Sequence, residues 1–260
     1  MNMEAFVQDL SPRLEMILEQ AREAGRVTVE DLAAYFSVTP QTIRRDLNEL
    51  CDQRLLKRVH GGAVLATGIE NVKYEARRLL ASEEKQRIGR RAAELIPDNC
   101  SLFINIGTTT EEVARALAGH RGLMAITNNI NVINILHSQP EIETIVTGGV
   151  LRHSDGGIVG EQATDFIRQF KVDYAVIGAS AIEEEGDLLD YDYREVRVSQ
   201  AIIENARTVF LVADHMKFSR SAPVRIGHLS QVDRLITDEP PPASLRRICE
   251  ESGVRVEIAT

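Results

Sequence analysis

Apolar residues recur at helical spacing near the start of the chain. Spacings of three and four residues place one set on a single helical face: Leu14, Ile17, Leu18 and Ala21. Pro12 marks the start of this helix and Gly25 its end. An apolar stretch at 27–29 predicts a short strand, and Thr28 with Asp31 matches a capping box for a second helix. We therefore predict two short helices separated by a strand.

A third amphipathic helix follows the turn at Ser37. Thr39 is a suitable N-cap, and Pro40 suits the first helical position, where no N–H is needed. One side of this helix is apolar: Ile43, Leu47 and Leu50. At about 100° per residue the opposite side is polar: Gln41, Arg44, Arg45 and Asn48. Three short helices with a tight turn before the last predict a helix-turn-helix.

Two short strands are expected after the third helix. "LLKRVH" and "AVLA" flank Gly61-Gly62, which permits a tight hairpin turn and makes the wing of a winged helix. We predict a winged helix-turn-helix DNA-binding domain at 1–66. Residues 67–91 are polar and rich in arginine, and we interpret them as a linker and a leading helix whose charge lies near DNA phosphates or on a solvated face.

Strand-like and helical segments alternate in the remainder of the chain, 92–260. The strand-like runs share a short, apolar, β-branched character: "SLFINI", "LMAIT", "ETIVT", "YAVIGA", "TVFLVA", "RLIT" and "VRVEIA". Helices are expected from about Thr110 and about Asn131. The alternation predicts an α/β fold with a largely parallel sheet and helices on its faces. Ligands of such sheets gather at the carboxyl ends of the strands.

The polar face of the third helix has the residue types that read DNA bases. Arginine fits guanine bidentately, glutamine and asparagine fit adenine, and threonine contacts base edges or phosphate. Two arginines on an isolated helix usually form an ordinary solvated face. The cap, the turn and the glycine-centred wing make DNA binding the preferred interpretation here.

Charge is divided unevenly along the chain. The net charge is −9, but residues 1–91 carry 15 basic and 14 acidic side chains, whereas residues 92–260 carry 15 and 25. The acidity therefore belongs to the C-terminal part. An overall acidic chain does not exclude an anionic partner, since binding depends on the local potential.

Several loops after the predicted strands are suited to an anion. "GTTT", 107–110, follows a buried strand and opens a helix, where backbone amides and hydroxyls bind phosphate. "TNN", 127–129, repeats the arrangement, and "TGG", 147–149, and "SDGGIVGE", 154–161, add flexible backbone on either side of Arg152. Each loop alone is commonly only a turn and a cap. Together, at strand ends, they predict a binding pocket.

Two groups of motifs resemble DeoR-type bacterial regulators. "VTVEDLAAYFSVTPQTIRRDLNEL" with "LLKRVHGGAVL" is similar to the winged-helix region of that family. The resemblance continues through "IGTTTEEVA", "TNNINVIN", "GGVLRHSDGGIVGE", "DYDYREVR" and "ADHMKF". It implies a transcriptional repressor released from double-stranded operator DNA by a phosphorylated polyol or sugar, with glycerol 3-phosphate the expected effector.

The residues expected to contact DNA lie on the third helix and the wing: Thr39, Gln41, Thr42, Arg44, Arg45, Asn48, Arg58 and His60. Those expected to contact the effector lie at the strand ends: Gly107, Thr108, Thr109, Thr110, Asn128, Asn129, Gly148, Gly149, Arg152, Glu195 and Lys217. A homo-oligomer is expected as well, because one winged helix reads only a short half-site.

The family's C-terminal domain resembles ribose-5-phosphate isomerase, which supplies an enzyme as the alternative function. The isomerase loop D-G-A-D-E corresponds to a stretch in which Gly178 and Ala181 replace two carboxylates. "EGDLLDYDY" lacks the isomerase lysine, and Glu195 and Lys217 alone do not make the positioned set that acid–base chemistry needs. We therefore expect a sugar-phosphate sensor without catalytic activity.

Other classes of site receive no support from the sequence. Cys51, Cys100 and Cys249 are far apart and form no CxxC pair, so neither a structural disulfide nor a zinc site is expected. No metal or organic cofactor is expected. "MNMEAFVQDL" lacks signal-peptide features, and no apolar run approaches the ~20 residues of a membrane span, so a cytoplasmic protein is expected.

Overall fold

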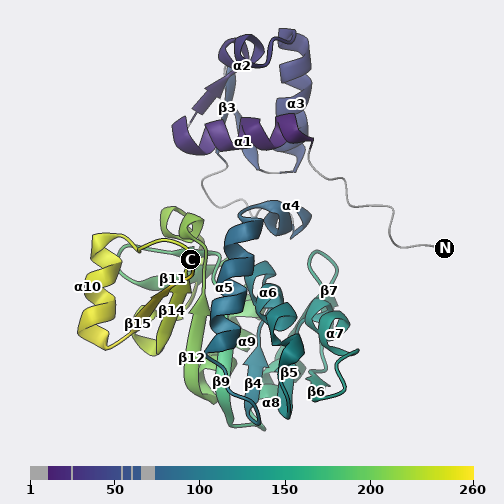
Figure 1. The fold of residues 1–260 in the computed structure, drawn as a ribbon, viewed down its shortest axis with the longest axis vertical. Coiled ribbons are helices and arrows are strands. Elements are labelled where there is room, and N and C mark those ends of the chain that lie inside the picture. Colours follow the sequence, from purple (N-terminus) through teal and green to yellow (C-terminus); the bar gives the residue numbers. More distant parts are fainter. Residues whose placement is uncertain (1–10, 25, 54, 60, 66–73) are drawn as a thin grey trace, which may run out of the picture. The chain divides into compact units, whose positions relative to one another are not determined.

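The computed structural model describes residues 11–24, 26–53, 55–59, 61–65 and 74–260, and the chain divides after Leu80 into two units (Figure 1). The N-terminal unit begins with three helices, three short strands and a further short helix: α1 (Pro12–Ala24), β1 (Arg26–Thr28), α2 (Val29–Phe36), α3 (Pro40–Asp52), β2 (Leu56–Val59), β3 (Gly62–Leu65) and α4 (Tyr74–Leu79). The winged helix-turn-helix expected from the sequence is confirmed. β1 lies one residue earlier than expected, and Val29 already belongs to α2.

Local signals set the ends of α2 and α3. The Thr28 side chain accepts a hydrogen bond from the Asp31 amide at 3.1 Å, and Ser37 ends α2 in the left-handed conformation, φ 52°. Thr39 caps α3 by accepting from the Thr42 amide at 3.2 Å. The apolar sides of the helices meet in a core whose largest fully buried members include Ile17, Leu32, Ile43, Leu47 and Leu50. Packing of that core orients α3.

The wing is an antiparallel pair of strands, β2 and β3, and β1 pairs with the free edge of β3. Gly61 turns the hairpin with φ 77°. A Cβ added at Gly62 would lie 1.9 Å from the Val27 carbonyl oxygen, so only glycine fits between these strands. The two glycines therefore permit the turn and the close approach of β1.

The C-terminal unit is built on a seven-stranded sheet in the order β15-β14-β12-β9-β4-β5-β6, with parallel neighbours throughout. Its main strands alternate with helices: α5 (Ser82–Glu94), β4 (Ser101–Ile104), α6 (Thr108–Ala116), η1 (Leu117–Gly119), β5 (Leu123–Thr127), α7 (Ile130–Leu136), β6 (Ile142–Val146), α8 (Glu161–Ile167), β9 (Val172–Ile177), α9 (Tyr193–Glu204), β12 (Ala206–Val212), η2 (His215–Ser219), η3 (Leu229–Gln231), β14 (Arg234–Thr237), α10 (Ala243–Ser252) and β15 (Arg255–Ile258). The predicted parallel α/β domain is confirmed, and α6 and α7 begin slightly before the expected Thr110 and Asn131.

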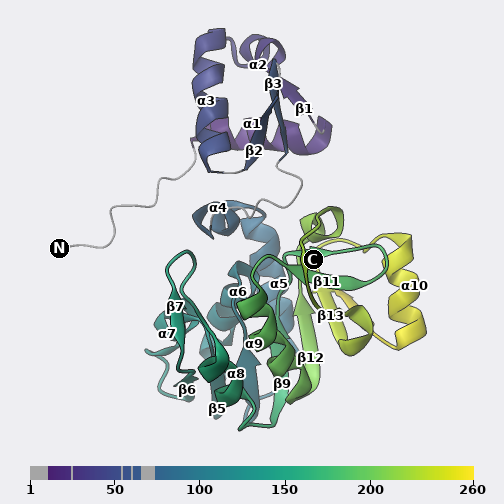
Figure 2. The ribbon, with the colours of Figure 1, turned by 180° about the vertical axis from the view of Figure 1, so that it is seen from behind.

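Helices cover both faces of this sheet. One core joins α5, α6 and α7 to the sheet, and the other joins α8, α9 and α10 to its opposite face. Figure 2, the view from behind, brings α8 and α9 to the front. Short strands follow the carboxyl ends of β6, β9 and β12 and form two small sheets: β7 (Val150–Arg152) with β8 (Gly157–Val159), and β10 (Ala181–Ile182) with β11 (Asp187–Asp190) and β13 (Val224–His228). None of the helices within the described ranges is long and apolar enough to span a bilayer.

The close crossing of α5 and α6 is made at a glycine. A Cβ added at Gly89 would lie 2.6 Å from the carbonyl carbon of Glu112 and 2.7 Å from its oxygen. Both contacts are to backbone, which cannot move aside as a flexible side chain would. Gly89 therefore sets the distance between the two helices.

Replacing Gly89 with alanine should destabilise the C-terminal unit. Overpacking typically costs about 1–3 kcal/mol, which exceeds the gain of about 1 kcal/mol from replacing glycine in a helix. Urea denaturation of the purified variant measures the free energy of unfolding. Gly119→Ala is the matched control, because nothing lies within 4 Å of a Cβ added there. Equal stability of the Gly89 variant and wild type would mean that α5 and α6 can separate freely.

Candidate functional site

The outer face of α3 presents the residues predicted to read DNA. Gln41, Arg44, Arg45 and Asn48 are exposed, whereas the apolar side of the same helix is fully buried. Thr39 and Thr42 share their hydroxyls at 2.9 Å at the start of the helix, so both belong to the cap as well as to the predicted interface. A hollow of about 670 Å³ lies beside this end of α3 and is lined in part by Gln41, Thr42 and Arg45. The predicted face is therefore accessible.

An ion pair between α1 and α3 was not foreseen from the sequence. Arg13 donates to Asp46 through Nε at 2.7 Å and through Nη2 at 3.1 Å, and Asp46 is buried. A two-bond arginine–carboxylate pair fixes orientation as well as distance. It ties the start of α1 to the middle of α3. Asp46 falls between Arg45 and Leu47, and helical spacing alone gave no indication of its partner.

The wing contributes one described candidate. Arg58 lies on β2 and is exposed. The prediction for His60 falls outside the described residues.

In the C-terminal unit the predicted loops meet at the carboxyl edge of the sheet. Gly107, with φ 153°, precedes α6, and Thr108, Thr109 and Thr110 form its first turn, all three buried. The Thr110 hydroxyl lies 2.7 Å from the Asn105 carbonyl and 2.8 Å from the Gly107 carbonyl, so it holds the loop in place. The first-turn amides of such a helix are the groups that bind anions.

The "TNN" loop is fixed mainly by its own hydrogen bonds. Asn129 caps α7, accepting from the Asn131 amide at 2.9 Å, and donates to Glu111 at 3.2 Å. Asn128 donates to the Ile158 carbonyl, whereas its Oδ1 and the Thr147 hydroxyl are buried without a hydrogen-bond partner among the described residues. In the "TNN" and "TGG" loops, the Asn128 Oδ1 and the Thr147 hydroxyl are therefore available to hydrogen-bond a ligand or water.

The "TGG" loop brings the β7–β8 hairpin close. Gly148 is exposed, while a Cβ on Gly149, φ 139°, would lie 2.8 Å from the Val159 carbonyl oxygen. The glycine at 149 is therefore needed for the close approach. Both remain predictions as effector contacts.

Arg152 is surrounded by carboxylates. Its Nε and Nη2 donate to Asp155 at 2.8 and 2.7 Å, its Nη1 donates to Asp192 at 3.1 Å, and its Nη2 also bonds to Glu195. The hairpin is thereby tied to the start of α9. An incoming phosphate would compete with three carboxylates for this guanidinium, so its predicted effector role stays a prediction.

Glu195 is buried within this cluster, with 8% of its surface exposed. Burial raises its pKa to about 8, the negative charge of Asp190 adds to the rise, and Arg152 opposes it. Asp192 behaves in the opposite way, because hydrogen bonding from Arg194 and Arg152 lowers its pKa to about 2 despite burial. Of these two carboxylates, Glu195 is therefore the one that keeps its proton as the pH rises toward neutrality.

Lys217 lies in η2, after the carboxyl end of β12. His215, in the same turn, donates its amide to Asp238 at 2.8 Å, and its Nδ1 lies 2.5 Å from the other oxygen of that carboxylate, which raises the pKa of His215. Asp238 thus anchors the turn that carries Lys217. His215, Asp238 and Glu239 also bring possible metal-ligand atoms within 4.8 Å of one another, but the short bond between the first two accounts for their proximity.

Gly178 separates the "GTTT" loop from the end of β12. A Cβ on Gly178 would lie 3.9 Å from both the Thr110 methyl and the Val212 carbonyl oxygen. A methyl group at this position would therefore be in ordinary van der Waals contact with both, so the loop and the strand end are separated by about the width of one small side chain. Ala181 is buried in β10.

Two residues of this edge were missed. Glu111, 1% exposed, accepts from Asn129 and Asn131 and links α6 to α7. Lys85 belongs to the charged segment 67–91, which was interpreted as lying near DNA phosphates or on a solvated face, yet it is 3% exposed. The signal for Lys85 was present in the sequence: it precedes Ile88 and Ala92 at helical spacing and so lies on the apolar side of α5.

Stability should fall with rising pH because of Glu195. Between the ordinary glutamate value of 4.5 and about 8, the folded protein keeps a proton that the unfolded chain releases. Stability therefore decreases through this window and levels off above it. Urea denaturation from pH 5 to pH 8 should show a smaller decline for Glu195→Gln than for wild type. Glu204→Gln, an exposed change on the same helix, is the control, and identical pH profiles in all three proteins would refute the buried proton.

Comparison with known proteins assigns both units to one family. Residues 13–68 match the DeoR-like helix-turn-helix domain, and residues 80–239 match the DeoR C terminal sensor domain. The chain is 48% identical to the glycerol-3-phosphate regulon repressor of Escherichia coli (strain K12), covering 93% of this chain and 96% of that one. It is 45% identical to the glycerol-3-phosphate regulon repressor of Haemophilus influenzae, covering 93% and 94%.

A solved structure gives a more distant likeness. Ribose 5-phosphate isomerase A from Methanocaldococcus jannaschii is 16% identical, with a TM-score of 0.40 over 53% of this chain and 55% of that one. The family matches span both units, and the chain therefore belongs to the DeoR family of helix-turn-helix regulators.

Proposed function

We propose that this protein represses a glycerol or glycerol 3-phosphate regulon by binding operator DNA through α3, and that a phosphorylated polyol releases it. One observation carries the proposal: the polar face of α3 is exposed to solvent, while the apolar face of the same helix is fully buried. The relatives that are 48% and 45% identical to this chain are glycerol-3-phosphate regulon repressors, which supports the choice of regulon.

The proposed DNA interface follows from side-chain chemistry. We expect Gln41, Arg44 and Arg45 to reach base edges in the major groove, with Thr42 and Asn48 contacting DNA beside them. Thr39 and Arg58 are suited to phosphate contacts, which position the protein without reading sequence. A symmetric operator would be read by a homo-oligomer. We assign the protein to the cytoplasm, where its operator DNA lies.

The proposed effector site has two electrically different ends. Asp214, after β12, lies within electrostatic reach of Lys217, Lys85 and Arg220. The Arg152 cluster, after β6, has an excess of carboxylates, which accept hydrogen bonds from hydroxyl groups. A ligand with a phosphate at one end and hydroxyls at the other, such as glycerol 3-phosphate, matches this distribution.

We propose that the site binds and does not convert its ligand. Gly178 and Ala181 stand where the isomerase loop has carboxylates, and a lone Glu195 does not complete an acid–base set. The sensor then acts by a difference in effector affinity between two states of the protein.

Removing one arginine from α3 tests the DNA interface. Arg44→Ala or Arg45→Ala should cost about 1–3 kcal/mol of specific binding if that arginine reads a base, with discrimination lost at one operator position. A change that removes only a phosphate contact weakens all sequences alike and lowers the salt dependence. Electrophoretic mobility shifts with operator and scrambled DNA separate the two cases. Arg247→Ala, an exposed change on α10, is the charge-matched control. Full specific affinity in both α3 variants would exclude this helix from recognition.

Effector release tests the sensor. Operator complexes are titrated with glycerol 3-phosphate, other polyol and sugar phosphates, glycerol and inorganic phosphate. We expect glycerol 3-phosphate to release wild type from the operator. The Lys217→Met variant should need at least roughly tenfold more glycerol 3-phosphate for release, because a charge-assisted hydrogen bond contributes about 1.5–3 kcal/mol. For each protein, operator affinity in the presence of effector is compared with the operator affinity of the same protein without effector. Isomerase turnover without specific DNA binding would favour the enzyme alternative instead.

A further inference from the structure

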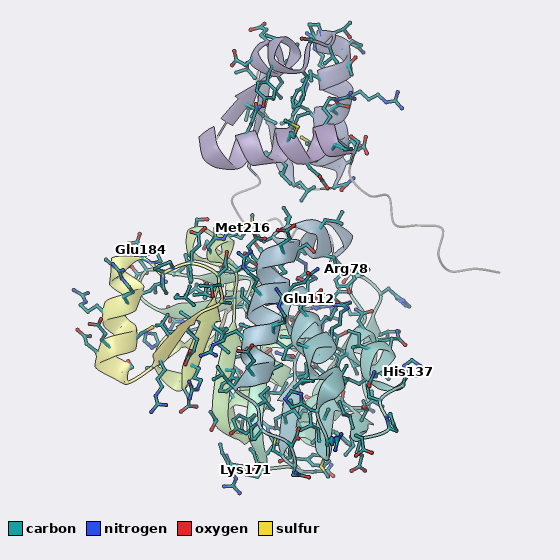
Figure 3. All side chains as sticks on the ribbon, in the orientation of Figure 1. Arg78, Glu112, His137, Lys171, Glu184 and Met216 are labelled. Atoms are coloured by element: carbon teal, nitrogen blue, oxygen red, sulfur yellow. The ribbon has the colours of Figure 1, made fainter. Side chains whose placement is uncertain are left out.

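A groove lies between two neighbouring helices, α8 and α9, on one face of the sheet. α8 leads into β9 and α9 leads into β12, and these two strands are parallel neighbours, so both helices run in the same direction (Figure 2). Lys171 donates to the Glu204 carbonyl at the end of α9, and Figure 3 shows Lys171 at the opposite end of the unit from Met216. The starts of both helices therefore lie together at the carboxyl edge. The groove has a volume of about 450 Å³.

The exposed charges of the two helices follow opposite orders. α8 presents Glu161 and Asp165 first and Arg168 last, at spacings that place all three on one side of the helix. α9 presents Arg197 near its start and Glu204, two turns later on the same side, at its end. One helix thus runs from negative to positive and the other from positive to negative.

These charges are largely uncompensated within the chain. Among the residues that the structure describes, neither Glu161 nor Arg197 forms an ion pair. Asp165 and Arg168 lie 3.5 Å apart as an exposed pair on one helix, a type of pair that contributes little to stability. Opposite charges on another molecule can therefore pair with them at small cost.

Apolar side chains lie exposed beside the start of α9. Tyr193, the first residue of α9, is 65% exposed, and Val150 on β7 is 61% exposed. Val150 and Arg152 lie on the same side of β7, because side chains alternate along a strand, and Arg152 bonds to Asp192, the residue before Tyr193. The two apolar side chains therefore belong to one surface. An apolar group surrounded by polar residues is typical of protein interfaces, in which tyrosine and arginine are enriched.

We propose that this α8–α9 surface, the exposed sides of both helices with Val150 and Tyr193, binds a second copy of the chain about a two-fold axis that runs along the helices. The inference rests on the homo-oligomer of the proposed function and names the surface that forms it.

A second copy is the partner that fits, because the surface carries its own complement. Rotation about this axis places α8 of one protomer over α9 of its partner, with both helices starting at the same end. Glu161 and Asp165 then face Arg197 of the partner subunit, and Arg168 faces Glu204 of the partner subunit. Each contact occurs twice, as in any isologous interface. The charge order of the two helices thus sets both the pairing and its direction.

Charge reversal followed by mixing tests the interface. Full-length wild type, Arg197→Glu, Asp165→Arg and the double variant are compared by light scattering after gel filtration. Each single variant brings like charges together at two contacts, so its mass should fall to half that of wild type. Mixing the two single variants should restore the wild-type mass, because the two reversed charges meet at one contact and the native pair meets at the other. The double variant should assemble for the same reason.

Arg90→Glu is the matched control. Arg90 is an exposed arginine on α5, which packs on the opposite face of the sheet, so this variant should keep the wild-type mass. Wild-type mass in both single variants, the mass of one chain in wild type, half mass in the Arg90 variant, or half mass in the mixture would each overturn the inference. Restored mass in the mixture also excludes misfolding, since misfolded chains would not complement each other.

DNA binding separates this inference from the proposed function. Each single variant should bind DNA with one half-site as wild type does, and DNA with two half-sites roughly a hundredfold more weakly, because the second contact is no longer intramolecular. Equal affinity of a single variant and wild type for two half-sites would contradict the interface. Absence of specific operator binding by wild type would instead overturn the proposed function, and the mass measurements would still decide the interface.

Discussion

The parallel sheet of the C-terminal unit imposes the constraint on which its chemistry depends. Parallel strands end at one edge, and the helices that return across the sheet begin at that same edge. The first turns of α5, α6 and α7 therefore lie with the strand ends that precede Asn128, Thr147, Gly178 and Asp214. The fold thereby brings together polar residues that are more than a hundred positions apart in sequence.

Burial then decides how charges at this edge are distributed. A charged group taken from water needs a partner of opposite sign. Around Arg152 one cation meets several anions, and the surplus is relieved by a proton on Glu195. Around Asp214 one anion meets several cations. The two halves of the edge thus carry opposite charge imbalances.

Local sequence was sufficient for much of the fold. Thr39 and Pro40 identified the start of α3, and Gly61 and Gly62 identified the wing, because caps and turns depend on a few neighbouring residues. Strand ends located the "GTTT" and "TNN" loops for the same reason. The outline of the candidate site was therefore predictable, including the carboxyl edge on which it lies.

The partners within the site were not predictable in the same way. Arg152 pairs with Asp192 and Glu195, about forty residues away, through a fold that brings β7 to α9. Sequence spacing alone does not predict these ion pairs. Lys85 differs, because its position on the apolar side of α5 was visible and was outweighed by the charge of its neighbours. A charged residue in an apolar stripe is more informative than the average charge of its helix.

A sensor must also convert occupancy into a difference between states, and this requires an element that the ligand and the second unit both influence. Tight binding alone shifts no equilibrium, because only a difference in affinity between states does so. α5 has two features that bear on this requirement. Gly89 fixes its distance from α6, and Ala81 at its start has a left-handed conformation next to the boundary between the two units. A rigid crossing transmits a displacement where a loosely packed one would absorb it. Gly89, by permitting the close approach of α5 to α6, supplies such a rigid crossing.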